Sequence, residues 1–170
     1  MSGEAGNRHR VYVSIGSNIN PAENLSRASV ALGSLLEDYE SSPVYRSPAV
    51  GLDGPDFLNS VVSGYTVSGA TDFNRCLNLI ETEHGRVRTA ERFTSRTLDL
   101  DLLLYDNVVL DQQGLVLPRP EILDAVFVLR PLSDLAPDLV HPLTGQTYSQ
   151  LLQQLYATSP ESKHLLTPVG

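Results

Sequence analysis

The run from Leu98 to Tyr105, Leu-Asp-Leu-Asp-Leu-Leu-Leu-Tyr, constrains the fold of this chain more than any other stretch. Its strongly apolar character predicts a β-strand. Because successive side chains on a strand point to opposite faces, Asp99 and Asp101 are expected on one face and the leucines that alternate with them on the other. The Cα atoms of the two aspartates would then lie roughly 6.5–7 Å apart.

Four arginines precede this strand in a polar segment: Arg86, Arg88, Arg92 and Arg96. The chain has only 12 Lys+Arg and a net charge of −8, so a third of its basic side chains gather here. This clustering predicts an anionic ligand, and the neighbouring aspartates predict a cation. A phosphorylated substrate with a divalent metal ion supplies both. Long polar loops of this kind are often functional lids.

The spacing of Asp99 and Asp101 is suited to two Mg²⁺ ions held about 3.5–4 Å apart, the arrangement used in phosphoryl transfer. Mg²⁺ is a hard cation that also takes phosphate oxygens as ligands. The alternative is a solvated strand face with two exposed acids, which would be favoured for an isolated Asp-x-Asp. The four arginines beside the pair favour the metal.

Composition limits the class of protein. A chain of 170 residues with 41% hydrophobic residues suits one domain with a proper core. A single cysteine, Cys76, excludes a disulfide framework and a thiolate metal site, and we expect it in the core. No run is long enough to span a membrane, and no apolar signal segment opens the chain. The acidic charge argues against nucleic-acid binding, and we expect a cytoplasmic monomer.

Hydrophobic periodicity and turn residues divide the first two thirds of the chain into strands and helices. The expected elements are strand Arg10–Ile15, helix Pro21–Leu36, strand Tyr39–Tyr45, strand Phe57–Val67, helix Thr71–His84 and strand Leu98–Tyr105. Asn20 and Glu23 predict a capping box at the start of the first helix. The order β-α-β-β-α-β is typical of a ferredoxin-like α+β domain.

C-terminal additions follow this core. They are a hairpin partner at Val108–Leu110, a helical turn at Pro118–Asp124, a strand at Val126–Leu129, and helices at Pro131–Ala136 and Tyr148–Tyr156. We place a disordered lead-in at residues 1–9, one domain at residues 10–157, and a loosely held C-terminal tail at residues 158–170.

Two weaker signals precede the arginine segment. Phe57 and Asn59 would share a strand face, and an aromatic ring with an amide suits a flat heterocycle. From these two residues alone, a core phenylalanine and an edge asparagine are the favoured interpretation. The Gly16–Asn18 turn could hold a phosphate through its backbone N–H groups, but a plain strand-to-helix turn needs no ligand.

Taken in order, the motifs resemble the 6-hydroxymethyl-7,8-dihydropterin pyrophosphokinase family of folate biosynthesis, from about Val11 to about Tyr156. The pieces that carry the resemblance are Gly16–Asn18, Tyr45–Pro48 with Gly51, Pro55–Asn59, Ile80-Glu81, Gly85–Arg88, Glu91-Arg92, Arg96–Asp101 and Phe127–Leu132. The resemblance implies transfer of pyrophosphate from MgATP to the hydroxymethyl group of a reduced pterin, with release of AMP.

The resemblance also implies roles for individual residues. Asp99 and Asp101 would hold two Mg²⁺ ions, with ATP as co-substrate. The transferring phosphates would be neutralised by the catalytic arginines Arg86, Arg92 and Arg96. The nucleotide would contact Arg88, Arg96, Leu102 and Arg119. The pterin would lie between Phe57 and Phe127, and its edge would meet Asn59, Ser47, Pro48 and Val50.

The chain departs from the family pattern in a few places. Arg119 stands where His is expected, Glu121 where Arg is common, and Ala125 where Arg is expected. Phe93–Ser95 and Thr89 also differ. Two alternatives therefore stay open: a divergent paralogue acting on a modified pterin, and a pterin- or nucleotide-binding protein without turnover. The paired aspartates argue against the second, since a binder needs no metal pair.

Overall fold

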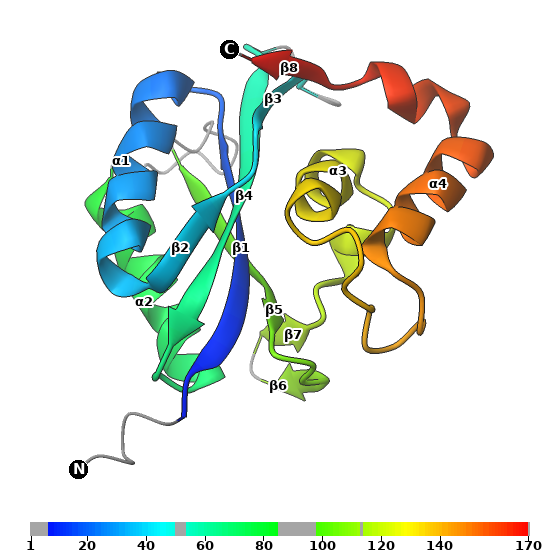
Figure 1. Cartoon of the computed structure of the whole chain (residues 1–170). Helices are drawn as coiled ribbons and strands as arrows, with labels where there is room; N and C mark the ends of the chain where they lie inside the picture. Colours follow the sequence, from blue (N-terminus) through cyan, green and yellow to red (C-terminus); the bar gives the residue numbers. More distant parts are fainter. Residues whose placement is uncertain (1–6, 50–53, 85–97, 113, 170) are drawn as a thin grey trace.

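The computed structural model describes residues 7–49, 54–84, 98–112 and 114–169. They form an antiparallel sheet with helices on both of its faces (Figure 1). The elements are β1 (His9–Ser17), α1 (Pro21–Leu35), β2 (Glu37–Ser41), β3 (Val44–Ser47), β4 (Phe57–Thr66), α2 (Ala70–Glu83), β5 (Asp99–Tyr105), β6 (Leu110–Gln112), β7 (Leu115–Leu117), η2 (Pro120–Leu123), α3 (Val126–Leu135), α4 (Tyr148–Thr158), η3 (Pro160–His164) and β8 (Thr167–Val169).

The main sheet has the strand order β5-β1-β4-β3-β8, and β2 also pairs with β4. Every described pairing in it is antiparallel. β1 therefore lies between β4 and β5, which arrive from distant parts of the chain. The predicted α+β class is confirmed at the level of mixed helices and an antiparallel sheet.

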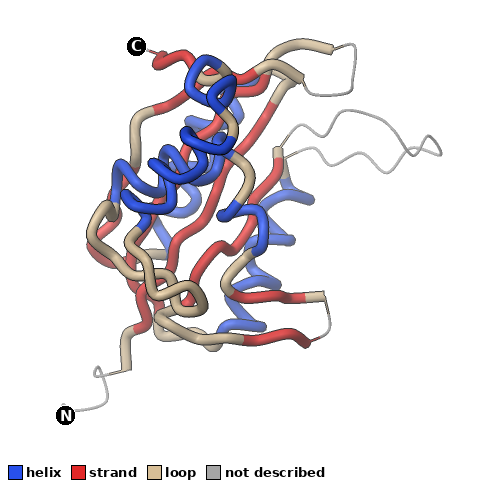
Figure 2. The backbone as a smooth tube through the Cα atoms, turned by 90° about the vertical axis from the view of Figure 1, so that its right-hand side faces the viewer, coloured by secondary structure: helices blue, strands red, loops and turns tan. Residues whose placement is uncertain are grey.

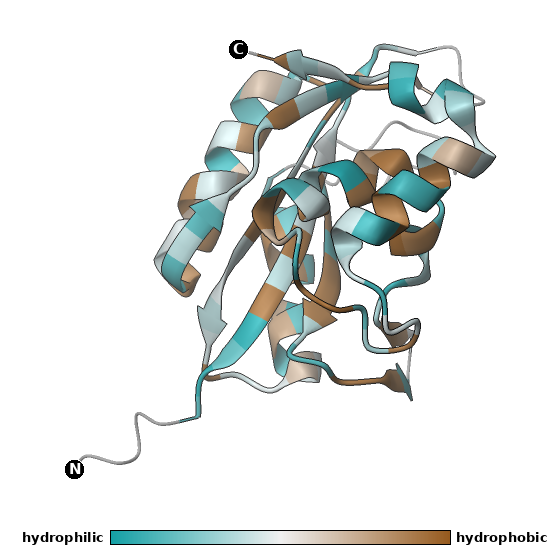
Figure 3. Ribbon diagram, turned by 45° about the vertical axis from the view of Figure 1, so that its right-hand side comes forward, coloured by the Kyte–Doolittle hydropathy of each residue, from teal (hydrophilic) through white to brown (hydrophobic). Residues whose placement is uncertain are grey.

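Two hydrophobic clusters hold the layers together, one on each face of the sheet. Val11, Val13 and Ile15 of β1 point into the cluster under α1 and α2. Tyr12 of β1 points the other way, into the cluster under α3 and α4. This alternation is the period-two pattern of a strand buried on both faces. Figure 3 shows apolar residues on the sides of the helices that meet the sheet.

The predicted strand at Val126–Leu129 is wrong, because these residues begin α3. Val126, Leu129 and Leu132 are all buried in one cluster, and this three-residue spacing is helical. A run of four apolar residues cannot by itself distinguish a strand from a buried helix. α3 continues through Pro131, so the separate helix predicted at Pro131–Ala136 is its second half.

The predicted hairpin between Leu98–Tyr105 and Val108–Leu110 is also wrong. After the turn at Asp106, the chain does not return along β5; Leu110–Gln112 pairs instead with Leu115–Leu117. This small β6–β7 hairpin stands apart from the main sheet (Figure 2). A turn signal marks where a strand ends, but it does not specify which strand the chain pairs with next.

The N-terminal capping box predicted for α1 does not form with any described residue. Asn20 has left-handed backbone angles (φ 42°, ψ 50°) and its side chain makes no capping hydrogen bond. The Asn24 side chain instead donates to the carbonyl of Ile19 at 2.6 Å. A capping box does occur at α4, between Thr147 and Gln150.

The single strand predicted at Tyr39–Tyr45 is divided into β2 and β3, both paired with β4. Pro43 lies at the break and has no N–H to donate to the sheet. Ser42 restores the connection, because its backbone N–H donates to the Val61 carbonyl at 2.8 Å and its hydroxyl accepts the Val61 N–H at 2.9 Å.

The two terminal segments and Cys76 were also the subject of predictions. Residues 158–170, expected as a tail, contain η3 and β8, and β8 pairs with β3 at the sheet edge. Residues 1–6 of the expected lead-in lie outside the described residues. Cys76, expected in the core, is only half-buried. None of the helices described in the structure is long and apolar enough to span a membrane.

Candidate active site

Strand pairing builds the floor of the site. Gly16 of β1 pairs with Asp99 of β5 on one side and with Asn59 of β4 on the other. Neighbouring strands lie about 4.8 Å apart, so Asp99 and Asn59 are two strand spacings apart, roughly 9–10 Å. The residue between them has no side chain. A carboxylate and an amide therefore share one sheet face across an open strip.

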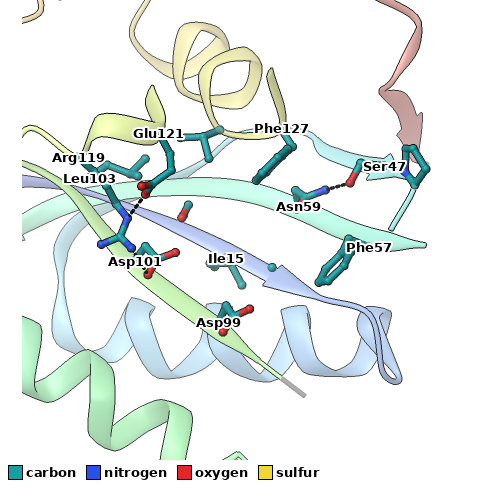
Figure 4. Close-up of a pocket in the computed structure, with 14 residues that line it drawn as sticks. Ile15, Ser47, Phe57, Asn59, Asp99, Asp101, Leu103, Arg119, Glu121 and Phe127 are labelled. Atoms are coloured by element: carbon teal, nitrogen blue, oxygen red, sulfur yellow. Dashed lines mark hydrogen bonds and ion pairs between the residues drawn. The ribbon is translucent and has the colours of Figure 1, made fainter. Parts of the chain in front are cut away.

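A cavity of about 320 Å³ lies over this floor, where α3 and η2 meet the sheet (Figure 4). Its wall residues come from separate parts of the chain: Ser14, Ile15, Gly16, Ser47, Pro48, Phe57, Asn59, Asp99, Asp101, Leu103, Arg119, Glu121, Phe127 and Val128. Its volume is at the lower end of the range for small-molecule sites.

One end of the cavity is aromatic and amide-lined. Phe57 begins β4, and Phe127 lies in the first turn of α3 (Figure 4). Asn59 is buried, and its side-chain N–H donates to the hydroxyl of Ser47 at 2.8 Å, which fixes the amide plane. Phe127 is 41% exposed. An exposed phenyl ring in a cavity wall, beside an oriented amide, suits a planar polar heterocycle.

The other end is charged. Asp99 and Asp101 line the cavity, while Leu100 and Leu102 of the same strand are buried in the opposite cluster. The predicted division of this strand into two faces is therefore confirmed. Arg119 reaches Asp101 with its Nη2 atom 3.3 Å from Oδ1, and its Nε donates to Glu121.

Glu81 of α2 anchors the strand that carries the two aspartates. Its side chain is 5% exposed, and one carboxylate oxygen accepts the backbone N–H of Leu100 at 2.9 Å. Leu100 lies between Asp99 and Asp101 in sequence. The buried hydrogen bond thus ties the start of β5 to a helix on the far face of the sheet and limits movement of both carboxylates.

The aromatic wall is tied to the sheet by a second polar contact. The hydroxyl of buried Tyr45, on β3, donates to the carboxylate of Asp134 on α3. Burial, reinforced by the hydrogen bond and charge of Asp134, raises the pKa of Tyr45 to about 12. Arg130 lies over the Tyr45 ring, 5.2 Å from its centroid. These contacts hold the helix that carries Phe127 against the strand that carries Ser47.

The structure brings together most of the described residues predicted for the site. Ser47, Pro48, Phe57, Asn59, Phe127, Asp99, Asp101 and Arg119 all line the one cavity. Leu102 is different, because its side chain is fully buried in the cluster on the other face. The predicted residues Val50, Arg86, Arg88, Arg92 and Arg96 lie outside the described residues.

Ser14 and Glu121 of the cavity wall were not among the predicted site residues. Ser14 enters the wall through strand pairing, as does Gly16, which was noted only for its turn, and pairing partners cannot be identified from one sequence. Glu121 was noted only as a departure from the family pattern. Its position two residues after Arg119, with an intervening proline, was the available signal that it lies near Arg119 in the site.

The cavity's carboxylates fit a metal ion that arrives with a phosphorylated substrate. Among the described residues, no group of three or more His, Cys, Asp or Glu side chains could hold a metal on its own. Mg²⁺ is commonly held by one or two carboxylates, with substrate phosphates and waters completing its coordination. Asp99 and Asp101 supply that number of carboxylates.

Known proteins identify the family of this chain. The family model for 7,8-dihydro-6-hydroxymethylpterin-pyrophosphokinase (HPPK) matches residues 12–137, well over half of the chain. The chain belongs to the HPPK family. The family predicted from the sequence motifs is confirmed.

Curated HPPK relatives match most of the chain. The 2-amino-4-hydroxy-6-hydroxymethyldihydropteridine pyrophosphokinase of Pseudomonas aeruginosa is 42% identical over 147 residues, which cover 84% of this chain and 90% of that protein. The protein of the same name from Synechocystis is 38% identical over 154 residues, covering 89% of this chain and 78% of that one.

Solved structures support the fold. The HPPK-DHPS A437G protein of Plasmodium falciparum, solved with pteroate, matches with a TM-score of 0.77 at 12% identity. The match covers 97% of this chain and 44% of that chain. The chain therefore spans a little under half of that solved protein, and at this identity the match shows the shared fold alone.

Proposed function

We propose that this cavity is the active site in which the chain transfers pyrophosphate from ATP to the hydroxymethyl group of 6-hydroxymethyl-7,8-dihydropterin, a step of folate biosynthesis. The reaction type follows from membership of the HPPK family and from the names of the curated relatives. The chain is an ATP-dependent pyrophosphokinase, and AMP is the second product.

One observation carries the assignment to this cavity. A single cavity has an aromatic and amide wall at one end and a carboxylate pair at the other, with Gly16 between them. The pterin binds between Phe57 and Phe127 and is read by Asn59, with Ser47, Pro48 and Val50 at its edge. Its hydroxymethyl group then points along the open strip towards Asp99 and Asp101.

The charged end receives the nucleotide. Asp99 and Asp101 would hold Mg²⁺, two ions in our proposal, and the bound metal would neutralise and orient the triphosphate. Arg86, Arg92 and Arg96 stabilise the transferring phosphates, and Arg88, Arg96 and Arg119 contact the nucleotide. Since the Leu102 side chain is buried away from the cavity, its contact with the nucleotide would use its backbone. The protein's contribution is positioning and charge stabilisation, as is usual in phosphoryl transfer.

Residues 10–157 form a ferredoxin-like βαββαβ domain with C-terminal additions. The order β5-β1-β4-β3 and the antiparallel pairings support this. The protein acts as a cytoplasmic monomer on two small molecules, without nucleic-acid or membrane partners, in line with its acidic charge.

The second candidate function is that of a divergent paralogue with a different pterin substrate. Glu121 lines the cavity and carries a negative charge close to the nucleotide end, which favours a paralogue that acts on a modified pterin. Turnover measured with a panel of pterins, including unmodified 6-hydroxymethyl-7,8-dihydropterin, distinguishes this paralogue from the first candidate. A protein that binds pterin or nucleotide without turnover is the third candidate.

The test is AMP formation from ATP on addition of the pterin and Mg²⁺. We expect AMP that depends on both. Asp101→Asn should remove turnover and leave pterin binding largely intact, because Asp101 lies at the other end of the cavity from Phe57 and Phe127. Asp111→Asn, the same change on the exposed strand β6, is the matched control.

Other products would contradict the assignment in different ways. ADP in place of AMP would indicate a simple phosphotransfer kinase. Folded protein that binds pterin but changes no nucleotide would indicate a binder. Unchanged turnover in Asp101→Asn would exclude the metal assignment.

A further inference from the structure

Arg119 forms an ion pair with Asp101, one of the two proposed metal ligands. Its Nη2 atom lies 3.3 Å from Oδ1 of Asp101, while its Nε binds Glu121 (Figure 4). One guanidinium therefore bridges an aspartate of the proposed metal pair and a second acid in the cavity wall. All three side chains line the same cavity.

The backbone holds Arg119 at this position. It lies between Pro118 and Pro120, has extended angles (φ −67°, ψ 131°), and its N–H donates to the carbonyl of Leu103 at 3.0 Å. Leu103 is two residues beyond Asp101 on β5. The flanking prolines restrict the backbone of the Pro-Arg-Pro segment, so the side chain is the part that can change partner.

The ion pairs of Arg119 with Asp101 and Glu121 can exchange for other partners. The side chains of Arg119, Asp101 and Glu121 are 31%, 41% and 48% exposed. Charge pairs this accessible to water are weak and screened by salt. A divalent ion accompanied by a triphosphate can therefore displace the guanidinium from Asp101, and the phosphates give the guanidinium a planar, bidentate partner in exchange.

We propose that Arg119 is a resident counter-cation of Asp101, and that it makes metal binding depend on the nucleotide. This inference rests on the proposed function of Asp99 and Asp101 as metal ligands. Without nucleotide, Arg119 competes with the metal for Asp101, and Glu121 holds the guanidinium in place. When the metal and the triphosphate arrive together, the metal takes Asp101 and Arg119 turns to the phosphates.

The test measures Mn²⁺ binding to the full chain by electron paramagnetic resonance, without nucleotide. We expect Arg119→Gln to bind Mn²⁺ roughly two- to fivefold more tightly than the unsubstituted protein, since the guanidinium of Arg119 no longer competes for Asp101. With a non-hydrolysable ATP analogue present, the same variant should bind the Mn²⁺–nucleotide complex more weakly, because a phosphate partner is lost.

Two control variants separate this effect from a change in net charge. Arg46→Gln removes the same charge from an exposed position on β3 outside the cavity, and we expect no change in Mn²⁺ binding. The double variant Asp101→Asn/Arg119→Gln should bind Mn²⁺ no more tightly than Asp101→Asn alone, because the competition acts through Asp101.

The outcomes distinguish failure of this inference from failure of the metal assignment. If Asp101→Asn weakens Mn²⁺ binding but Arg119→Gln leaves it unchanged, the counter-cation role is excluded and the metal ligands stand. Equal tightening in Arg46→Gln and Arg119→Gln would likewise exclude it. If neither Asp99→Asn nor Asp101→Asn affects Mn²⁺ binding, the metal assignment itself fails, and the role of Arg119 fails with it.

Discussion

At the scale of single residues, the site depends on the absence of a side chain at Gly16. Its two strand partners, Asp99 and Asn59, mark the two ends of the cavity. A Cβ atom at Gly16 would lie 3.5 Å from Oδ1 of Asn59, which is ordinary van der Waals contact. Alanine therefore fits at this position, whereas a branched side chain projects into the strip between the amide and the carboxylate.

We predict that Gly16→Val weakens pterin binding by at least about tenfold, which corresponds to about 1.4 kcal/mol. Valine favours strands, so the free energy of unfolding should change little. Gly16→Ala is the matched control and should weaken binding much less. Calorimetric titration with the pterin measures both variants, and thermal melts check their folding. Similar affinities in the two variants would contradict an open strip at this position.

At the scale of secondary-structure elements, the cavity lies between the sheet and α3. A hydrogen bond from the Tyr45 hydroxyl on β3 to the charged carboxylate of Asp134 connects the sheet to α3. Phe127 and Asp134 lie seven residues apart, about two turns, and so share one side of the helix. The position of the aromatic wall therefore depends on a contact outside the cavity.

Tyr45→Phe should lower the free energy of unfolding by about 1 kcal/mol, because Asp134 loses the Tyr45 hydroxyl as a donor and keeps the longer hydrogen bond from Nε of Arg130, at 3.4 Å. For a chain of this size the melting temperature should fall by roughly 2–4 °C. Tyr39→Phe, which removes a hydroxyl bonded to Ser29, is the control with a neutral partner and should cost less.

The free energy of unfolding at high pH should also depend on the contact between Tyr45 and Asp134. The pKa of Tyr45 is raised from 10.0 to about 12, so the folded state favours the protonated phenol. Its contribution to stability is complete below pH 10 and is lost as the pH rises through 12. Tyr45→Phe should flatten this part of the stability curve. An unchanged curve would show that the hydroxyl contributes nothing.

At the scale of the whole molecule, segments distant in sequence are held together by buried polar groups as well as by the two clusters. His141, in the connection between α3 and α4, is only 1% exposed. Its Nδ1 atom accepts the backbone N–H groups of Leu143 and Thr144, at 3.1 and 3.2 Å. The ring packs edge-on against Tyr148 of α4, which is fully buried.

Burial lowers the pKa of His141 below 6.5, because the charged ring is poorly solvated there. The unfolded chain therefore binds the proton more readily, and stability should be fully present above pH 6.5 and fall as the pH drops below it. Protonation at Nδ1 would also remove the acceptor for both N–H groups. Chemical denaturation between pH 7.5 and 5 should show a smaller loss in His141→Asn, and an equal loss would contradict this role.

Local features whose causes lie within a few residues could be predicted from the sequence alone. The alternation of Asp and Leu after position 97 set the two faces of β5, and the ordered motifs identified the family. Apolar spacing predicted α1 and α2 nearly to their ends. Each of these depends on strand or helix periodicity, which a single segment carries in full.

Which strands pair and which segments pack together depends on the tertiary structure. It made Val126–Leu129 part of a helix, because burial against the sheet outweighs the strand preference of a short apolar run. It placed Gly16 between Asp99 and Asn59, and it set Arg119 on Asp101 through a hydrogen bond to β5. Pairing and packing join residues far apart in the chain, and a single sequence does not record such contacts.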